Sequence, residues 1–176
     1  MGSGASKVIP SPTAWTLIGL LFAILAAVYY GVGDPVAAGL LLVLSGIFDV
    51  VDGAVARATG KTSARGAFLD STLDRVSEVL IYLGIIFGNY TSSYLVLLAL
   101  SLSLLVSYTR AKADSLGVNL AGIGVGERSE RLVVLIVASL LPAVMLGVLI
   151  VAILAFLTFV ERTIKVSKSL GRPRLA

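Results

Sequence analysis

The stretch Phe48–Glu78 reads FDVVDGAVARATGKTSARGAFLDSTLDRVSE, and it decides how the rest of the chain must fold. It lies in a chain of 176 residues that is 57% hydrophobic and only 14% charged, yet it contains four aspartates: Asp49, Asp52, Asp70 and Asp74. A carboxylate in the hydrocarbon region of a bilayer costs roughly 2.5–3.5 kcal/mol on insertion scales. Four carboxylates near one depth therefore need compensation, and bound divalent cations are the simplest source.

The spacing of these aspartates predicts two helices that face each other. Asp49 and Asp52 are three residues apart, and Asp70 and Asp74 are four apart, so each pair projects from one face of a helix. The segment 60–66 between the pairs is rich in glycine and hydroxyl residues, which favour a turn. Two antiparallel helices joined there would direct four carboxylates at one another. Hard oxygen ligands in that number favour Mg²⁺, Mn²⁺ or Ca²⁺ over zinc.

The same residues resemble a family signature. The chain is similar to the CDP-alcohol phosphotransferases, and it fills every fixed position of their pattern: Asp49-x-x-Asp52-Gly53-x-x-Ala56-Arg57, eight further residues, then Gly66-x-x-x-Asp70-x-x-x-Asp74. The resemblance implies an enzyme that takes a CDP-linked lipid and an alcohol, releases CMP and leaves a phosphodiester. The alternative is that the aspartates form only a polar lip at helix ends. Eight specified residues at set spacing across two helices argue against that alternative.

The resemblance also implies roles for individual residues. Asp74 matches the general base, and the metal ligands would be Asp49, Asp52, Asp70 and Asp74, holding Mg²⁺ or Mn²⁺, with two ions expected. The positions that match nucleotide-binding residues are Asp52, Gly53, Ala56, Arg57, Gly66 and Thr16. Thr16 belongs to Pro12-Thr13-x-x-Thr16, which has threonine where the family's element usually has asparagine. Two alternatives stay open: Gly53 and Ala56 could serve close helix packing, and Arg57 could extend to the membrane interface.

Two later segments resemble the phosphatidylinositol-phosphate and archaetidylinositol-phosphate synthases of this family. They read SYTRAKAD over 107–114 and ERSERL over 127–132. The resemblance implies an acceptor-phosphate site made by Ser107, Arg110 and Lys112 with an arginine of the second segment, Arg131 in preference to Arg128. The alternative is that these cations are ordinary interfacial anchors. The implied acceptor is inositol phosphate, with glycerol phosphate or serine as rivals. The implied donor is a CDP-activated lipid, and an archaeal ether lipid is expected.

The composition predicts an all-α polytopic membrane protein. The mean hydropathy is +1.00, and a soluble domain of this size could not cover its surface with so few charges. The chain lacks cysteine and histidine, so disulfides, thiol chemistry and imidazole zinc sites are excluded. At about 20 residues per span, six transmembrane helices fit the length. We expect the first four at 13–30, 35–58, 66–87 and 92–117. The fifth should start near 129 and end between 142 and 147, and the sixth should end near 164. These spans form one catalytic domain, 13–165, between a flexible start, 1–12, and a basic tail, 166–176.

The positive charges orient these predicted spans. In a six-span arrangement the lysines and arginines fall on one side, and the three opposite connections contain none. Positive charge accumulates on the cytoplasmic side of membrane proteins. We therefore expect a cytoplasmic-membrane protein with both termini cytoplasmic and an active site between the second and third helices near that face. Homodimers are usual in the family, and no nucleic-acid partner is expected.

A membrane cation transporter is the alternative from a different functional class, because transporters also use intramembrane aspartates. Such a protein needs polar groups leading to both faces of the membrane. The predicted outer half offers only Asp34 and Asn89. A site open to one side favours an enzyme.

Overall fold

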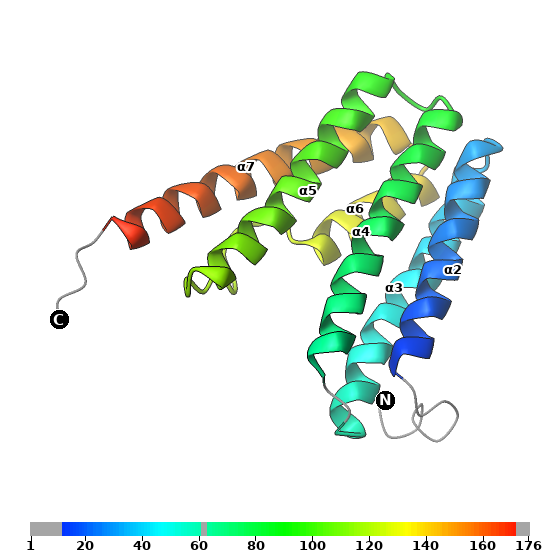
Figure 1. Ribbon diagram of the computed structural model, residues 1–176. Coiled ribbons are helices and arrows are strands. Elements are labelled where there is room, and N and C mark those ends of the chain that lie inside the picture. Colours follow the sequence, from blue (N-terminus) through cyan, green and yellow to red (C-terminus); the bar gives the residue numbers. More distant parts are fainter. Residues whose placement is uncertain (1–11, 61–62, 172–176) are drawn as a thin grey trace.

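The computed structural model describes residues 12–60 and 63–171, and all regular structure in these ranges is helical. The helices are α2 (Pro12–Gly31), α3 (Pro35–Ala58), α4 (Ala64–Phe87), α5 (Ser93–Ser115), α6 (Arg128–Leu140) and α7 (Val144–Leu170) (Figure 1). The all-α prediction is confirmed. Part of the predicted 60–66 turn, Lys61 and Thr62, lies outside the described residues, as do the predicted start up to residue 11 and the tail from residue 172. Residues 166–170 of the predicted tail belong to α7.

Polar side chains determine where several helices begin. The carboxylate of Asp34 accepts the Ala37 amide at 2.9 Å at the start of α3, and the Ser63 hydroxyl accepts the Gly66 amide at 3.0 Å at the start of α4. At the start of α6, the Glu127 amide donates to a Glu130 carboxylate oxygen at 2.6 Å. Such caps satisfy amides that have no partner inside the helix. The cap at Ser63 fixes the register of α4 and therefore the direction of its aspartates.

Four helices are long and apolar enough to cross a membrane: Thr13–Gly31, Pro35–Ala58, Ser93–Ser115 and Val144–Leu170. Helix α4 has 24 residues, but its first half carries several charges. Helix α6 has 13 residues, which at 1.5 Å per residue is about 20 Å and short of the ~30 Å hydrocarbon core. The chain therefore has the helices of a membrane protein, while six full spans stay a prediction.

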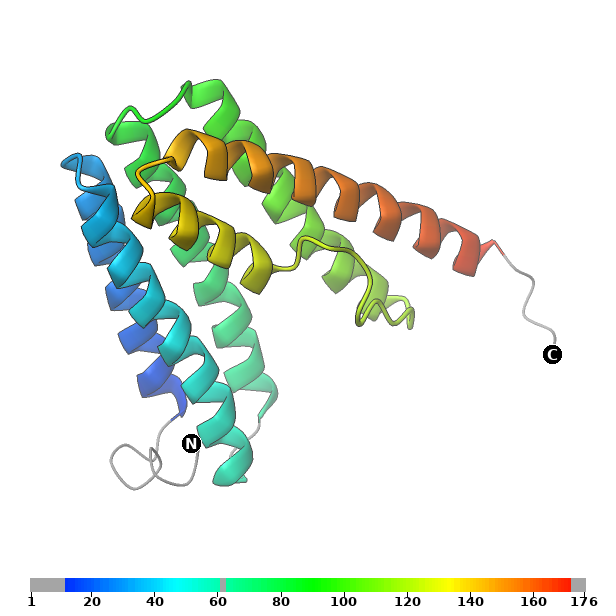
Figure 2. The ribbon, with the colours of Figure 1, turned by 180° about the vertical axis from the view of Figure 1, so that it is seen from behind.

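The helices form two groups joined by α6. Helix α2 packs against α3 and α4, α5 packs against α7, and α6 contacts both α3 and α7. The second group lies at an angle to the first (Figures 1 and 2). A close crossing of α2 and α4 depends on Gly84, because a Cβ there would overlap the Ala27 backbone.

One hydrophobic core lies at the end of the helices remote from the aspartates. It includes the end of α2, the start of α3 and the end of α4, as well as the starts of α5 and α7 and the middle of α6; representative residues are Tyr30, Leu42, Ile85, Val96, Leu135 and Val148. A hydrogen bond between the Tyr30 and Ser139 hydroxyls ties α2 to α6 in this region. At the other end of the helices, polar side chains line the space between the two groups.

The connector 116–127 between α5 and α6 packs closely on α7. Gly124 has a φ of +97°, and a Cβ at that position would collide with the Thr158 side chain. Leu120 and Ile123 form a small apolar cluster with Ala113 of α5. Because the connector leads directly into α6, this packing positions the first residues of α6.

Candidate functional site

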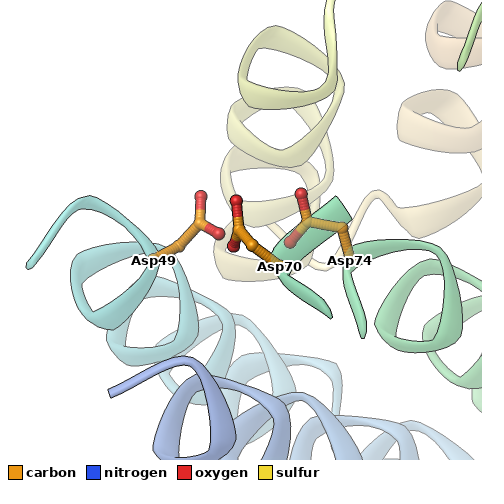
Figure 3. A group of neighbouring side chains, drawn as sticks. All are labelled: Asp49, Asp70 and Asp74. Carbon is orange, nitrogen blue, oxygen red and sulfur yellow. The ribbon is translucent and has the colours of Figure 1, made fainter. Parts of the chain in front are cut away.

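The structure brings three of the four aspartates together. Asp49 of α3 and Asp70 and Asp74 of α4 each offer a carboxylate oxygen, and these oxygens lie within 4.8 Å of one another. Figure 3 shows the three side chains directed toward one another from the two helices. Oxygen Oδ1 of Asp70 is buried and has no hydrogen-bond partner in the described part of the chain. A buried, unpartnered oxygen beside two further carboxylates fits a hard divalent cation.

The fourth aspartate is directed elsewhere. Asp52 is 6% exposed, and its carboxylate accepts the Thr16 hydroxyl of α2 at 2.8 Å. Three residues on a helix turn through about 300°, so Asp52 is rotated by roughly 60° from Asp49. That rotation directs Asp52 toward α2, outside the group of three.

Every residue expected to bind the nucleotide lines one cavity of about 230 Å³ between α2, α3 and α4. Its walls include Thr16, Asp52, Gly53, Ala56, Arg57, Gly66 and Asp70. Gly53 leaves room for the Arg57 guanidinium, because a Cβ at 53 would lie 3.3 Å from one of its terminal nitrogens. We call this space the α2–α4 cavity.

A second cavity, of about 750 Å³, lies on the other side of the aspartates. We call it the arginine cavity, since its walls hold Arg75, Arg110, Arg128, Arg131 and Arg162 together with Ser107, Asp49, Asp70 and Asp74. Asp70 lines both cavities, so the carboxylate group forms their common boundary.

The structure does not bring Lys112 to either cavity. Ser107, Arg110, Ala111 and Asp114 follow helical spacing along the cavity wall of α5, whereas Lys112 is exposed and is absent from that wall. Two residues turn a helix by about 200°, which carries Lys112 to the side opposite Arg110.

Arg128 sits directly against the aspartates. One terminal nitrogen lies 3.0 Å from Oδ2 of Asp49, and the other lies 2.9 Å from Oδ1 of Asp74. The guanidinium therefore links the first residue of α6 to both α3 and α4. Arg75 adds a weaker contact, 3.5 Å from Asp74.

Arg131, the arginine preferred from sequence, is 2% exposed and firmly bound. Its Nε and a terminal nitrogen lie 3.3 and 2.8 Å from one Glu78 oxygen, and its other terminal nitrogen donates to the Gly126 carbonyl at 2.6 Å. It lines the arginine cavity, but its hydrogen bonds hold α6 and the connector against α4. Its direct contact with an acceptor stays a prediction.

Arg162 of α7 was missed as a site residue. It is 2% exposed, and it donates to the carbonyls of Ile123 and Val106 at 2.9 and 3.2 Å and to Glu127 at 2.9 Å. From the sequence, Arg162 is only one of the charges expected on the cytoplasmic side. A usable signal was present, because Glu161 and Arg162 interrupt a helix that is apolar from residue 144 to residue 160.

The chain is similar in sequence to proteins of one known family. The family model described as CDP-alcohol phosphatidyltransferase matches residues 10–164. The archaetidylinositol phosphate synthase of Pyrococcus horikoshii is 41% identical over 160 residues, covering 91% of this chain and 85% of the relative. The protein of the same name from Methanothermobacter thermautotrophicus is 41% identical over 157 residues, covering 86% of this chain and 80% of the relative.

The chain is also similar in structure to a solved phosphatidylinositol phosphate synthase. The crystal structure of Mycobacterium tuberculosis phosphatidylinositol phosphate synthase with CDP-DAG bound superposes with a TM-score of 0.85 at 27% identity, over 99% of this chain and 96% of that one. The complex of that enzyme with manganese and citrate gives a TM-score of 0.86 at 27% identity, over 99% of this chain and 91% of that one.

Proposed function

Since this chain belongs to the CDP-alcohol phosphatidyltransferase family, we propose that it transfers the lipid-bearing phosphoryl group of a CDP-lipid to inositol phosphate and releases CMP. The observation that carries this proposal is the pair of cavities that meet at the aspartates. One is lined by six of the eight residues of the family signature, and the other is lined by five arginines together with Asp49, Asp70 and Asp74. The relatives named as inositol phosphate synthases support the choice of acceptor.

The α2–α4 cavity is the proposed site for the CDP group. Gly53 and Ala56 have small side chains on the cavity side of α3, so a nucleotide can approach the helix backbone there. The Arg57 guanidinium lies at that wall, where it can contact the pyrophosphate. The hydrogen bond between Thr16 and Asp52 fixes the opposite wall.

The metal ligands in this proposal are Asp49, Asp70 and Asp74, with Asp52 one helical turn away as a further candidate. Mg²⁺ or Mn²⁺ is the expected metal, with two ions. A bound divalent cation would offset the charge of the pyrophosphate and assist departure of CMP. The manganese in the M. tuberculosis structure is consistent with this expectation.

The arginine cavity is the proposed acceptor site. A phosphate dianion favours convergent guanidinium groups, because arginine can meet it through two parallel hydrogen bonds. Arg110 is half-exposed and Arg128 is 22% exposed, so both can turn toward a ligand. Ser107 lies on the same wall as Arg110. Neutral serine would not need this concentration of positive charge.

Asp74 is the proposed general base. Its carboxylate lies in the arginine cavity, next to the group of three aspartates. The acceptor hydroxyl would give its proton to Asp74 while its oxygen bonds to the lipid-bearing phosphorus. The bond from that phosphorus to the bridging oxygen would break, and CMP would leave with that oxygen. This assignment needs no histidine or cysteine, and the chain contains neither.

The topology in this proposal is a homodimer of six-span subunits in the cytoplasmic membrane, with the aspartates near the cytoplasmic face and both termini on that side. The four candidate spans and the polar end of the helices support it.

Cysteines can report the orientation, because the chain has none. A cysteine at Ser63 should react only with a reagent on the cytoplasmic side, and one at Ser92 only from outside.

The decisive experiment measures CMP release by purified protein supplied with a CDP-lipid and one acceptor at a time. The panel contains inositol phosphate, free inositol, glycerol phosphate and serine, with either diacyl or archaeal ether CDP-lipid. Inositol phosphate should give the highest kcat/KM. Release with glycerol phosphate or serine but not with inositol phosphate would refute the acceptor assignment and leave the family assignment intact.

A further inference from the structure

We propose that Arg128 and a divalent cation compete for the same aspartates, so that metal binding transfers the Arg128 guanidinium from the carboxylates to the acceptor phosphate. Arg128 would thus couple the two ligands and make each bind more tightly in the presence of the other. The identity of the phosphate ligand rests on the proposed function. The competition between arginine and metal rests only on the geometry of the carboxylates.

The competition follows from shared carboxylates. The two carboxylates that Arg128 contacts, at 3.0 and 2.9 Å, are those of Asp49 and Asp74, which belong to the group of three suited to a cation. A guanidinium at that distance uses the oxygen lone pairs that a metal would need. A divalent ion bound among these oxygens would also lie within a few ångströms of the positive guanidinium, in a half-buried place where water screens charges poorly.

Asp70 has a carboxylate oxygen that can bind the metal without first losing a hydrogen bond. Its Oδ1 is buried and has no hydrogen-bond partner within residues 12–60 and 63–171. A cation can first bind Asp70 and then take Asp49 and Asp74 from Arg128. In the metal-free protein the guanidinium offsets part of the negative charge of two carboxylates that would otherwise repel each other, so they are held close together before the metal arrives.

Arg128 can move more easily than the two buried arginines of the cavity, Arg131 and Arg162. Arg131 is fixed by Glu78 and the Gly126 carbonyl, and Arg162 donates to two backbone carbonyls and to Glu127. Moving either would leave buried polar groups unpaired, which is unfavourable. The hydrogen bonds of Arg128 in the described structure go to carboxylates that a metal would satisfy, and its side chain already lines the arginine cavity. Among the arginines of this cavity, Arg128 is therefore the one whose transfer to a phosphate would release both Asp49 and Asp74.

Thermodynamic linkage then gives a measurable consequence. If phosphate binding removes Arg128 from the aspartates, it must strengthen metal binding, and metal binding must strengthen phosphate binding by the same factor. The fixed arginines would contribute affinity for phosphate without this exchange.

The test is a Mn²⁺ titration of the detergent-solubilised protein, followed by the EPR signal of free Mn²⁺, with no lipid and no turnover. Arg128→Gln should bind Mn²⁺ about tenfold or more tightly than wild type. Arg110→Gln is the matched control, because it removes the same charge from the same cavity without touching the aspartates; it should change the affinity less than threefold. Saturating inositol phosphate should tighten Mn²⁺ binding by wild type several-fold and have no such effect on Arg128→Gln.

Equal or weaker Mn²⁺ binding by Arg128→Gln, relative to Arg110→Gln, would overturn the proposal. If Arg128→Gln does not fold, the wild-type measurement decides alone, since Mn²⁺ affinity that is unchanged by inositol phosphate, glycerol phosphate and inorganic phosphate contradicts the exchange. The acceptor assignment is judged separately by CMP release. A protein that shows the exchange but uses serine would therefore be recognised as such.

Discussion

The two cavities that meet at Asp70 differ in how they can hold a phosphate. The α2–α4 cavity contains one arginine, Arg57, and is walled by small residues and hydroxyl groups. The arginine cavity is more than three times larger, at about 750 against 230 Å³, and holds five arginines. The difference indicates two strategies. In the function proposed above, phosphates in the first cavity would depend on the metal for charge compensation, whereas a phosphate in the second would also contact guanidinium groups.

The arginines of the second cavity also differ among themselves. Arg131 and Arg162 are buried and are hydrogen-bonded to the protein, and they hold α6 and the connector in place. Arg110 and Arg128 are more accessible and can contact a ligand. The arginine cavity therefore has two buried arginines that form a fixed frame and two more accessible arginines that can contact a ligand, and mutations should separate these roles.

The largest expected effect removes part of the frame. Arg131→Ala leaves Glu78 buried without its cation, and breaking a buried pair in this way costs about 3–5 kcal/mol. Thermal unfolding in detergent should show a large loss of stability. The double variant Arg131→Met with Glu78→Leu should recover much of it, because no isolated buried charge remains. Equal losses in the single and double variants would show that the pair is not the frame described above.

The next effect concerns the boundary shared by the two cavities. Asp70→Asn should fold normally but lose at least about two orders of magnitude in CMP release, as expected for loss of a metal ligand. Asp34→Asn is the matched control, because it makes the same chemical change at the cap of α3 far from the site, and asparagine also caps helices well. Excess chelator should abolish wild-type activity. Near-normal turnover by Asp70→Asn would contradict the metal assignment.

A smaller and more selective effect is expected for a binding group of the arginine cavity. Arg110→Ala should raise the KM for inositol phosphate by about tenfold, roughly 1.4 kcal/mol, and leave the KM for the CDP-lipid nearly unchanged. Lys112→Ala removes a cation two residues away that faces outside the cavity, and it should change either KM less than twofold. Similar effects of the two variants would indicate a general charge effect rather than a cavity contact.

The smallest effect tests the other cavity. Gly53→Ala would place a methyl group 3.3 Å from the Arg57 guanidinium and should raise the KM for the CDP-lipid about two- to fivefold, the order of a ~0.5–1 kcal/mol local adjustment, without changing the acceptor KM. Gly46→Ala is the control on the same helix: its methyl group would lie equally close, 3.3 Å, to Leu132 instead of Arg57. A raised KM for the CDP-lipid in both variants would indicate an effect on helix packing rather than on nucleotide binding.

The residues proposed for the donor half lie together in the structure, as the sequence predicted, because most of them are close along the chain. Their contact with a nucleotide stays a prediction. They come from one helical hairpin, α3 and α4, with Thr16 added from α2. Helical periodicity alone brings Asp52, Gly53, Ala56 and Arg57 to one wall. The sequence did not separate Asp52 from the other three aspartates. Its spacing of three residues from Asp49 rotates it by only about 60°, and the position of α2, which supplies the Thr16 hydroxyl, could not be predicted.

The acceptor half could be read only in part, since it is assembled from α5, α6 and α7. Helical phase alone could not exclude Lys112, because Tyr108, one turn earlier on the same face of α5, does line the cavity. The position of Arg162 depends on how α7 crosses α5, and the burial of Arg131 depends on a partner, Glu78, that lies 53 residues earlier in the chain. The all-α class followed from composition. The 13-residue length of α6 did not, because Leu141, Pro142 and Ala143 interrupt an apolar sequence whose hydropathy continues unchanged.

Because the hydrophobic core lies far from the aspartates, a small rotation of a helix about the core produces a larger displacement at the site. Ile85 belongs to that core and Asp70 lies 15 residues away along α4, which corresponds to about 22 Å of helix. A rotation of α4 by about 5° around its packed end would therefore displace Asp70 by about 2 Å relative to the arginines, a distance that matters for a reacting geometry. Exchanges of side-chain volume around Ile85 or Val148 can thus tune the gap between donor and acceptor without touching either one. Adaptation of this enzyme to a new working temperature has a route that leaves its catalytic residues unaltered.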